Sequence, residues 1–228
     1  MQIVIGNGLI ANSFKQVIFS KDVLIFASGV SSSLENNFKA FEREEVLLRE
    51  TITAHNSFPI IYFSTCSIYS NVKNSYILHK LKMEDIVKNI SSSHFIYRLP
   101  QVVGPTSNST LISFFVNQIK LSENLNIQIH AKRNLIDCVD VTKIVHFLVE
   151  NSLGKDSIQN IATPINIAVI EIAKEISLIL GKKLIFSKIN SGDQYDISIN
   201  FLANHLKDFN YLNEKNYWQK VLRKYVCI

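Results

Sequence analysis

The strongest constraint on the fold is a regular alternation of short apolar runs with longer segments that carry an apolar stripe. The apolar runs predict strands, at residues 2–5, 17–19, 23–27, 59–63 and 94–99. The striped segments predict helices, at residues 10–15, 34–56 and 75–90. Runs that are apolar on both faces and alternate with helices are typical of a parallel sheet covered on both sides. We therefore expect an α/β fold with a doubly wound parallel sheet and helices on both of its faces.

The rest of the chain continues this alternation less regularly. It predicts helices near 109–121, 140–151 and 167–180, and strands near 126–130 and 184–188. A chain of 228 residues is long enough for one α/β domain with a well-formed core and too short for two full domains. We expect one domain with a small C-terminal region attached to it.

The charge distribution, the cysteines and the apolar stretches limit the kinds of partner that the chain could bind. The net charge of +5 is spread over the chain without a basic block, which argues against nucleic acid and needs only an anionic small ligand. Cys66, Cys138 and Cys227 are widely spaced and form no CxxC pair, so neither a disulfide framework nor a metal site is expected. No stretch approaches the roughly 20 apolar residues that span a bilayer. We expect a soluble, cytoplasmic protein that does not bind membranes.

A glycine pattern ends the first predicted strand. Gly6-Asn7-Gly8-Leu9-Ile10-Ala11 matches G-x-G-x-x-A between a strand and a helix. In this pattern the first glycine permits a tight turn, the second lets the backbone approach a pyrophosphate, and the small last residue lets helix and strand pack closely. The pattern indicates a dinucleotide site, although a strand-to-helix turn in an unrelated α/β protein gives the same match.

A second candidate group involves the helix predicted at 75–90. Tyr76 and Lys80 are four residues apart, so both side chains project from one helix face. An ammonium beside a phenol lowers a pKa that starts near ~10, which makes the tyrosine a usable proton donor or acceptor. Thr65 follows the strand predicted at 59–63, at the end where doubly wound sheets bind ligands. The alternative interpretation of the spacing is a solvated lysine beside an interfacial tyrosine.

In this order the motifs resemble the extended short-chain dehydrogenase/reductase family, the NAD-dependent epimerases, dehydratases and keto-reductases of sugar nucleotides. The chain looks like a shortened member. Besides the glycine turn, the resemblance is carried by the segments VLIFASG, FSTCSIY, YILHKLKMEDIV, YRLPQVVGP, NLIDCVDVTKIV and IQNIATPINIAVIEIAKEI. It implies one Rossmann-like NAD(P)-binding domain over residues 1–228, in which residues 105–135 and 185–228 contribute a small substrate-binding lobe.

The resemblance also implies a role for each matching residue. Thr65 would hydrogen-bond the sugar oxygen, Tyr76 would donate or remove its proton, and Lys80 would bind the nicotinamide ribose. The residues implied to contact the cofactor are Gly6, Asn7, Gly8, Leu9, Ile10, Ala11, Ala27, Ser28, Gly29, Lys80, Pro100 and Gln101. With Thr65, the residues expected to line the substrate are Ser67 and Val103.

The sequence departs from the family in three places. Only Ser20, Lys21 and Asp22 separate two predicted strands; Ser20 and Lys21 at the adenosine ribose would suit a 2′-phosphate and favour NADP over NAD, but an ordinary solvated lysine is equally consistent. The Asp-Glu pair that follows the threonine in sugar 4,6-dehydratases is replaced by Cys66 and Ser67, which argues against dehydration. The substrate-binding part is also reduced.

We therefore expect an NAD(P)-dependent reductase of a nucleoside-diphosphate 4-keto-6-deoxy sugar, in surface polysaccharide synthesis, with Tyr76 as general acid. A nucleotide-sugar 4-epimerase that retains bound NAD is the first alternative. A non-catalytic Rossmann protein that binds a nucleotide or a partner chain is the second. The resemblance further implies a homodimer through the helices near 34–56 and 75–90.

Overall fold

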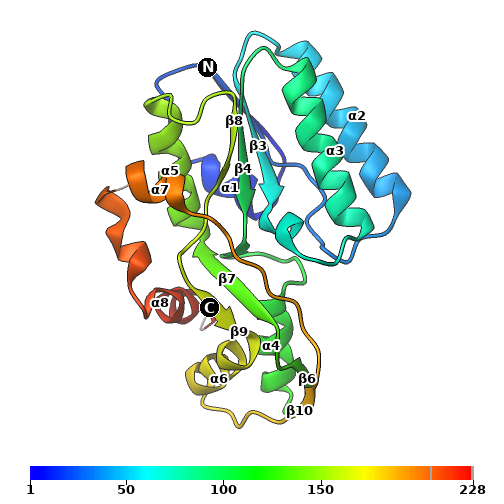
Figure 1. The fold of residues 1–228 in the computed structure, drawn as a ribbon, viewed down its shortest axis with the longest axis vertical. Helices are drawn as coiled ribbons and strands as arrows, with labels where there is room; N and C mark the ends of the chain where they lie inside the picture. Colours follow the sequence, from blue (N-terminus) through cyan, green and yellow to red (C-terminus); the bar gives the residue numbers. More distant parts are fainter. Residues whose placement is uncertain (206, 227–228) are drawn as a thin grey trace. The chain divides into compact units, whose positions relative to one another are not determined.

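The computed structural model describes residues 1–205 and 207–226, with the backbone alone at Asp208. Cys227, one of the cysteines considered above, lies outside the described residues. The chain forms two compact units, each with sheets of its own (Figure 1). Unit 1 consists of Met1–Ile68, Lys73–Leu99 and Cys138–Ile161, and unit 2 consists of Tyr69–Val72, Pro100–Asp137 and Ala162–Ile228.

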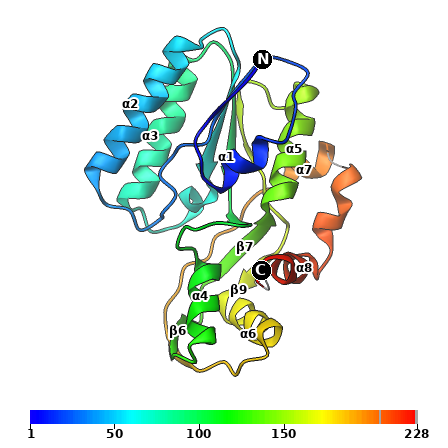
Figure 2. The same ribbon diagram turned by 180° about the vertical axis from the view of Figure 1, so that it is seen from behind.

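Unit 1 is a five-stranded parallel sheet with helices on both faces. In spatial order, the strands are β1 (Gln2–Ile5), β2 (Val23–Phe26), β3 (Ile60–Thr65), β4 (His94–Leu99) and β8 (Ser157–Asn160). The helices are α1 (Leu9–Phe14), α2 (Phe38–Ala54), α3 (Ser75–Ile90) and α5 (Cys138–Glu150), and the 3-10 helix η1 (Cys66–Tyr69) follows β3. In Figures 1 and 2, α2 and α3 cover one face of the sheet, and α1 and α5 cover the other. The predicted Rossmann-like α/β fold is confirmed.

The strands of unit 1 lie side by side in the order in which they occur along the chain. β1, β2 and β3 therefore follow one another in a single direction across the sheet, yet the intervening helices α1 and α2 lie on opposite faces. The β1–α1–β2 crossover must then have the opposite hand to the β2–α2–β3 crossover. Because about 98% of such crossovers are right-handed, one of these neighbouring connections is an exception to the rule.

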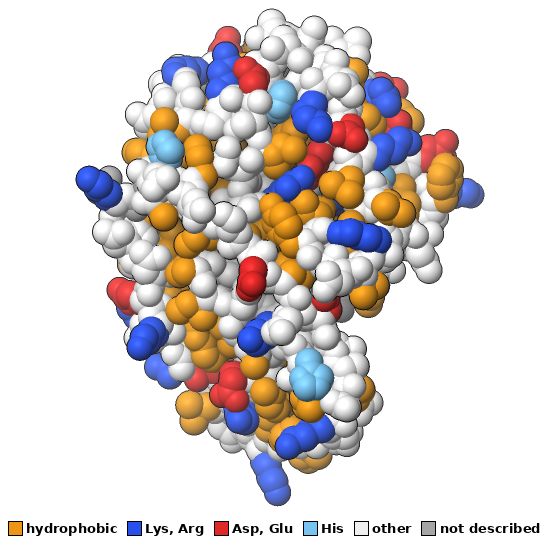
Figure 3. Space-filling model, viewed as in Figure 1, with side chains coloured by type: hydrophobic (Ala, Val, Ile, Leu, Met, Phe, Trp, Pro, Cys, Tyr) orange, Lys and Arg blue, Asp and Glu red, His pale blue; other side chains and the backbone are white. Residues whose placement is uncertain are grey.

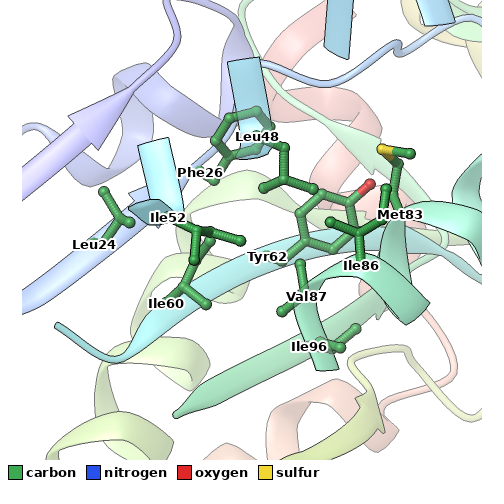
Figure 4. Close-up of a cluster of buried hydrophobic side chains, with 10 residues drawn as sticks. All are labelled: Leu24, Phe26, Leu48, Ile52, Ile60, Tyr62, Met83, Ile86, Val87 and Ile96. Atoms are coloured by element: carbon green, nitrogen blue, oxygen red, sulfur yellow. The ribbon is translucent and has the colours of Figure 1, made fainter. Parts of the chain in front are cut away.

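One apolar core of unit 1 lies between the sheet and the helices α2 and α3. Successive side chains of β3 point to opposite faces, so Tyr62 packs under α2 and α3, whereas Phe63 lies with its ring centroid 5.4 Å from that of Phe14 in α1. Figure 4 shows the ten buried residues of this core: Leu24, Phe26, Leu48, Ile52, Ile60, Tyr62, Met83, Ile86, Val87 and Ile96. Their burial fixes α2 and α3 against the sheet.

The strand predicted at 17–19 does not form. Val17 N donates to the carbonyl of Phe14 at 3.2 Å, which turns the chain back onto the end of α1. Phe19 N donates to the side-chain oxygen of Gln2 at 3.3 Å instead of joining a strand ladder. Phe19 is buried against the ring of Phe14, so the apolar run marks a packed turn and the prediction is wrong here.

Unit 2 contains two smaller sheets. In the first, β7 (Lys132–Asp137) is parallel to β5 (Gln101–Val103) and antiparallel to β9 (Asn166–Ala168); in the second, β6 (Leu125–Gln128) is parallel to β10 (Phe186–Ile189). The helices are α4 (Leu111–Lys120), α6 (Val169–Leu180), α7 (Asn200–His205), the 3-10 segment η2 (Lys207–Asn213) and α8 (Tyr217–Val226). The predictions of α4, β6, α6 and β10 are confirmed within a few residues, whereas β5, β7, β9 and α8 were not predicted.

Charges of both signs intermingle with hydrophobic side chains on the face shown in Figure 3. This agrees with the scattered charge expected from the sequence. Within the described part of the chain, no helix combines the length and the apolar character that crossing a bilayer requires.

Candidate active site

The candidate site lies at the carboxyl edge of the unit 1 sheet. β1, β2 and β3 are parallel neighbours, and residues 6–8, 27–29 and 65–67 follow them at the same edge. Open α/β sheets bind ligands outside the carboxyl ends of their strands. The structure thus brings three of the predicted segments to one edge of the sheet.

The glycine turn packs directly against the end of β2. Gly6 has a φ of +126°, and a Cβ atom at this position would lie 2.4 Å from the carbonyl oxygen of Ala27. The position therefore needs glycine for both its backbone conformation and its contact. Gly8 is the N-cap of α1 and has nothing within 4 Å of its ideal Cβ position, while Ala11 is fully buried. The space beside Gly8 is what the close approach of a ligand to backbone requires.

The other predicted residues at the glycine turn and at the end of β2 are part of the local backbone structure. Asn7 lies in the turn, where its carbonyl accepts a hydrogen bond from Asn12 Nδ2 at 2.9 Å. Leu9 and Ile10 form the start of α1. Ala27 N donates to the last residue of β1 at 2.8 Å and so extends the pairing of β1 with β2.

A buried ion pair fixes Lys80 at this edge. Lys80 Nζ lies 2.8 Å from Glu44 Oε1 and donates to Tyr62 OH at 3.2 Å. The second Glu44 oxygen accepts from Val30 N at 2.6 Å and lies 2.9 Å from His79 Nε2. Lys80 is 3% exposed and Glu44 is 0% exposed. These values exclude a solvated lysine, because the ammonium is held inside a network that satisfies a buried carboxylate.

Glu44 carries the negative charge of this network. Burial by itself raises the pKa of the Glu44 carboxyl, but the Lys80 ammonium and the hydrogen bonds from His79, Lys80 and Val30 N outweigh it and hold that pKa well below its usual range. Burial, and then the charge of Glu44, raise the pKa of Tyr62 well above its usual value. Tyr62 therefore stays protonated and donates to Glu44 Oε1 at 2.8 Å.

Gly29 leaves room for the ion pair. A Cβ atom on Gly29 would lie 2.5 Å from Lys80 Nζ and 2.8 Å from Glu44 Oε1. The ammonium of Lys80 therefore lies beside the backbone that follows β2, two residues beyond the contact between Ala27 and the glycine turn. Gly29 was predicted to contact a cofactor, and in the structure its immediate neighbours are the Lys80 and Glu44 side chains.

Tyr76 presents a hydroxyl group at the start of α3, and Thr65 presents one at the end of β3. Tyr76 lies one turn before Lys80 on α3, is 7% exposed, and packs with Val30 and Ile77. No hydrogen bond engages its phenol within the part of the chain that the structure describes. Thr65 ends β3, and its hydroxyl accepts from Ser67 N at 3.1 Å. A hydroxyl that accepts one bond can still donate its own proton, so Thr65 remains able to bind a substrate oxygen.

Cys66 does not act as an acid or base at neutral pH. Burial raises the pKa of its thiol to about 12. Its Sγ donates to the carbonyl of Arg98 at 3.3 Å, which ties the end of β3 to β4. The thiol beside Thr65 therefore stays protonated at neutral pH.

Ser20 and Lys21 lie at the opposite edge of the sheet. They precede β2, whereas a ribose-binding residue follows its strand at the carboxyl edge. Ser20 N donates to Glu150 Oε1 at 2.7 Å, and Ser20 Oγ also bonds to this carboxylate. Lys21 Nζ donates to Glu150 O at 3.0 Å and to Ser152 Oγ at 3.1 Å. The predicted 2′-phosphate contact is therefore corrected: both residues stabilise the C-terminal end of α5, where a cation is favourable.

The other predicted site residues belong to unit 2. Pro100 precedes β5, and Gln101 and Val103 lie in that strand, in register with Leu135 and Asp137 of β7. The expected lobe of residues 105–135 and 185–228 falls within unit 2 as well. Its binding of a substrate, and the cofactor contacts of Pro100 and Gln101, stay predictions.

Glu44 is the residue that the motif analysis missed. It lies on the apolar stripe of α2, one helical turn before Leu48, and a glutamate in such a stripe is a recognisable signal. His79 also belongs to the network, where its ring stacks on Phe41 at 4.6 Å. Glu44 lies outside the segments that suggested the site, whereas His79 lies inside one of them, between Tyr76 and Lys80.

Several solved structures share this fold. A dTDP-4-dehydrorhamnose reductase ortholog of Clostridium acetobutylicum superposes with a TM-score of 0.75 at 13% identity, over 100% of this chain and 99% of that chain. RMD of Pseudomonas aeruginosa, complexed with NADPH, gives 0.70 at 16% identity, over 88% and 78%. The UDP-glucose 4-epimerase of Thermus thermophilus, complexed with NAD, gives 0.69 at 15% identity, over 96% and 80%. At these identities the likeness shows the fold alone.

No curated protein sequence matches the chain significantly. The sequence model of the NAD dependent epimerase/dehydratase family matches residues 14–162. The match begins after the glycine turn and spans well over half of the 228 residues, including β2, β3, α3 and β4. The chain therefore belongs to the NAD dependent epimerase/dehydratase family.

Proposed function

We propose that this chain is an NAD(P)-dependent oxidoreductase that acts on a nucleoside-diphosphate sugar and reduces a 4-keto-6-deoxy sugar. The observation that carries the proposal is the fixed ammonium of Lys80, held by Glu44 beside Gly29 at the carboxyl edge of the sheet. A binding module has no need to bury a lysine one helical turn from a tyrosine whose phenol is uncommitted. Family membership and the reductase among the similar structures support the same reaction class.

The residues at this edge fit the nicotinamide end of the cofactor. Gly8 leaves backbone open to a phosphate, and Lys80 offers an ammonium to ribose hydroxyls. A bound nicotinamide supplies hydride transfer. The chain itself orients the sugar oxygen through Thr65 and gives that oxygen a proton from the Tyr76 phenol.

A 4-epimerase is the second candidate, supported by the epimerase among the similar structures and by the family description. It requires the same Thr65, Tyr76 and Lys80 but retains its cofactor through turnover. Purified protein that carries NAD would favour it. The choice between NAD and NADP is left open in the proposal, because Ser20 and Lys21 bond to Glu150 and give no reason to prefer NADP.

A homodimer and a cytoplasmic role in surface polysaccharide synthesis are part of the proposal. Apolar side chains on the outer sides of α2 and α3 support pairing of these helices with their copies: Phe38 is 74%, Val46 48% and Leu78 59% exposed. Sedimentation that finds only monomer at micromolar concentration would reject the dimer.

The test is a titration of wild-type protein and Tyr76→Phe with NADH and NADPH, followed by oxidation of the bound form with a panel of nucleoside-diphosphate 4-keto sugars. Tyr97→Phe is the matched control, because the buried Tyr97 hydroxyl has no hydrogen-bond partner in the described part of the chain. We expect all three proteins to bind cofactor and only Tyr76→Phe to lose turnover, by roughly 10²–10⁴-fold. Failure of the wild-type protein to bind either cofactor would reject both enzyme candidates.

A further inference from the structure

The unit 1 sheet lacks the reversal of strand order that a complete dinucleotide site uses. In the doubly wound fold, two mononucleotide-binding halves meet where the strand order reverses, and a dinucleotide lies across that point. Here the order is β1-β2-β3-β4-β8, which follows the chain in one direction. β1, the strand that carries the glycine turn, is therefore the edge of the sheet instead of its middle.

β1 lies at the edge of the sheet because the segment that follows it is short. Only residues 6–22 join β1 to β2, and they form the glycine turn, α1 and the packed turn at 17–19. The two strands pair directly, from Gln2 with Val23 to Ile5 with Phe26. Among the described residues no strand pairs with the outer side of β1, and its four residues are all partly exposed.

Ser20 and Lys21, at the end of this link, lie at the edge of the sheet opposite to the glycine turn. Ser20 and Lys21 are committed to Glu150 and Ser152 at the amino edge of the sheet. They cannot hold an adenosine ribose or its phosphate at the carboxyl edge. Among the described residues, unit 1 therefore lacks the strands that would carry the adenosine half of the site, and Ser20 and Lys21 do not replace them.

Unit 1 retains groups that fit the opposite half. Gly6 packs on Ala27, Lys80 lies beside Gly29, and Thr65 ends the next strand. These groups suit a phosphate, a ribose and a reacting carbonyl in that order along the edge. We propose, building on the oxidoreductase function above, that this chain recognises its cofactor through the nicotinamide mononucleotide half alone and leaves the adenosine without a binding pocket in unit 1.

The test compares NADH with reduced nicotinamide mononucleotide by calorimetry on wild-type protein. We expect the two dissociation constants to agree within about threefold, because adenosine adds little contact, and we expect AMP not to displace either ligand. NADH binding more than about thirtyfold tighter than the mononucleotide, or displacement of NADH by AMP, would overturn the inference while leaving the proposed function intact. Binding of neither reduced ligand would reject the proposed function and the inference together.

Discussion

The two edges of the unit 1 sheet use their lysines in different ways. At the carboxyl edge, Lys80 is 3% exposed and its ammonium is shared by Glu44 and Tyr62. At the amino edge, the exposed Lys21 bonds to a carbonyl and a hydroxyl at the end of α5. Water solvates an exposed ammonium at little cost, whereas burying a charged pair is expensive unless its geometry is good. Of the two lysines, the one at the carboxyl edge is therefore held as a buried charge with its counter-ion, and the one at the amino edge is a surface contact.

The largest expected effect comes from removing the carboxylate of that edge. Glu44→Ala leaves Lys80 buried without its anion and removes the acceptor for Val30 N. We expect a loss of about 3–5 kcal/mol in the free energy of unfolding, measured by urea denaturation. Glu45→Ala, the next residue of the same helix, is the control: its pairs with Arg49 and Lys82 lie at the surface, so about 1 kcal/mol or less is expected. Equal losses of stability in Glu44→Ala and Glu45→Ala would contradict the distinction between a buried ion pair and surface ion pairs.

The glycine turn offers a second matched pair. Gly6→Ala would strain a backbone at φ +126° and press a Cβ against a carbonyl oxygen at 2.4 Å, so we expect it to cost about 1–3 kcal/mol or more. Gly8→Ala meets nothing within 4 Å and should change the free energy of unfolding by less than about 0.5 kcal/mol, while reducing cofactor binding. Thermal unfolding of both variants measures the difference. A destabilisation by Gly8→Ala as large as that by Gly6→Ala would contradict this account of the turn.

Acid should reduce the contribution of the buried Glu44 carboxylate to the free energy of unfolding. The pKa of Glu44 is depressed in the folded protein, so its contribution to stability is present above the unfolded value of about 4.3 and is lost as the pH falls through the folded value. We expect the stability advantage of wild type over Glu44→Gln to be constant above about pH 5 and to shrink steadily below it. Denaturation curves at several pH values measure this. An advantage that grows on acidification would have the wrong sign for an ionised Glu44.

The smallest effect is expected at the amino edge. Lys21→Ala removes bonds to the end of α5 and should cost about 0.3–1 kcal/mol. The ratio of NADPH to NADH binding should not change, because Lys21 is not at the edge where the cofactor is proposed to bind. A selective loss of NADPH binding in this variant would show that the two edges are not separate in function.

Much of unit 1 could be predicted from the sequence. The predicted strand at 94–99 and helix at 75–90 have the bounds of β4 and α3, because long periodic segments between clear turns leave little ambiguity. The run at 17–19 could not be recognised as a turn, since its amides bond to a helix end and to the Gln2 side chain. The strand order could not be predicted for the same reason. With a strand expected at 17–19, the sequence did not indicate that β1 lies at the edge of the sheet.

The candidate site could be proposed in part from the sequence. Gly6, Thr65, Tyr76 and Lys80 could be singled out by spacing and position, because glycine turns and strand ends have local signatures. Glu44 lies 36 residues before Lys80, so their contact is a property of the packing of α2 on α3. In unit 2, the three-residue strands β5 and β9 are too short to show a period, which explains why they were not predicted.

The position of β1 at the edge of its sheet also bears on local unfolding. A strand with one neighbour keeps half of its backbone groups outside the ladder, and the residues of β1 are only partly buried, whereas every residue of β3 is buried. Amide hydrogens of β1 should therefore exchange with solvent earlier than those of β3. The glycine turn is attached to this edge strand, so a ligand that binds there would also slow exchange in β1, and its affinity would include the free energy of keeping the strand closed.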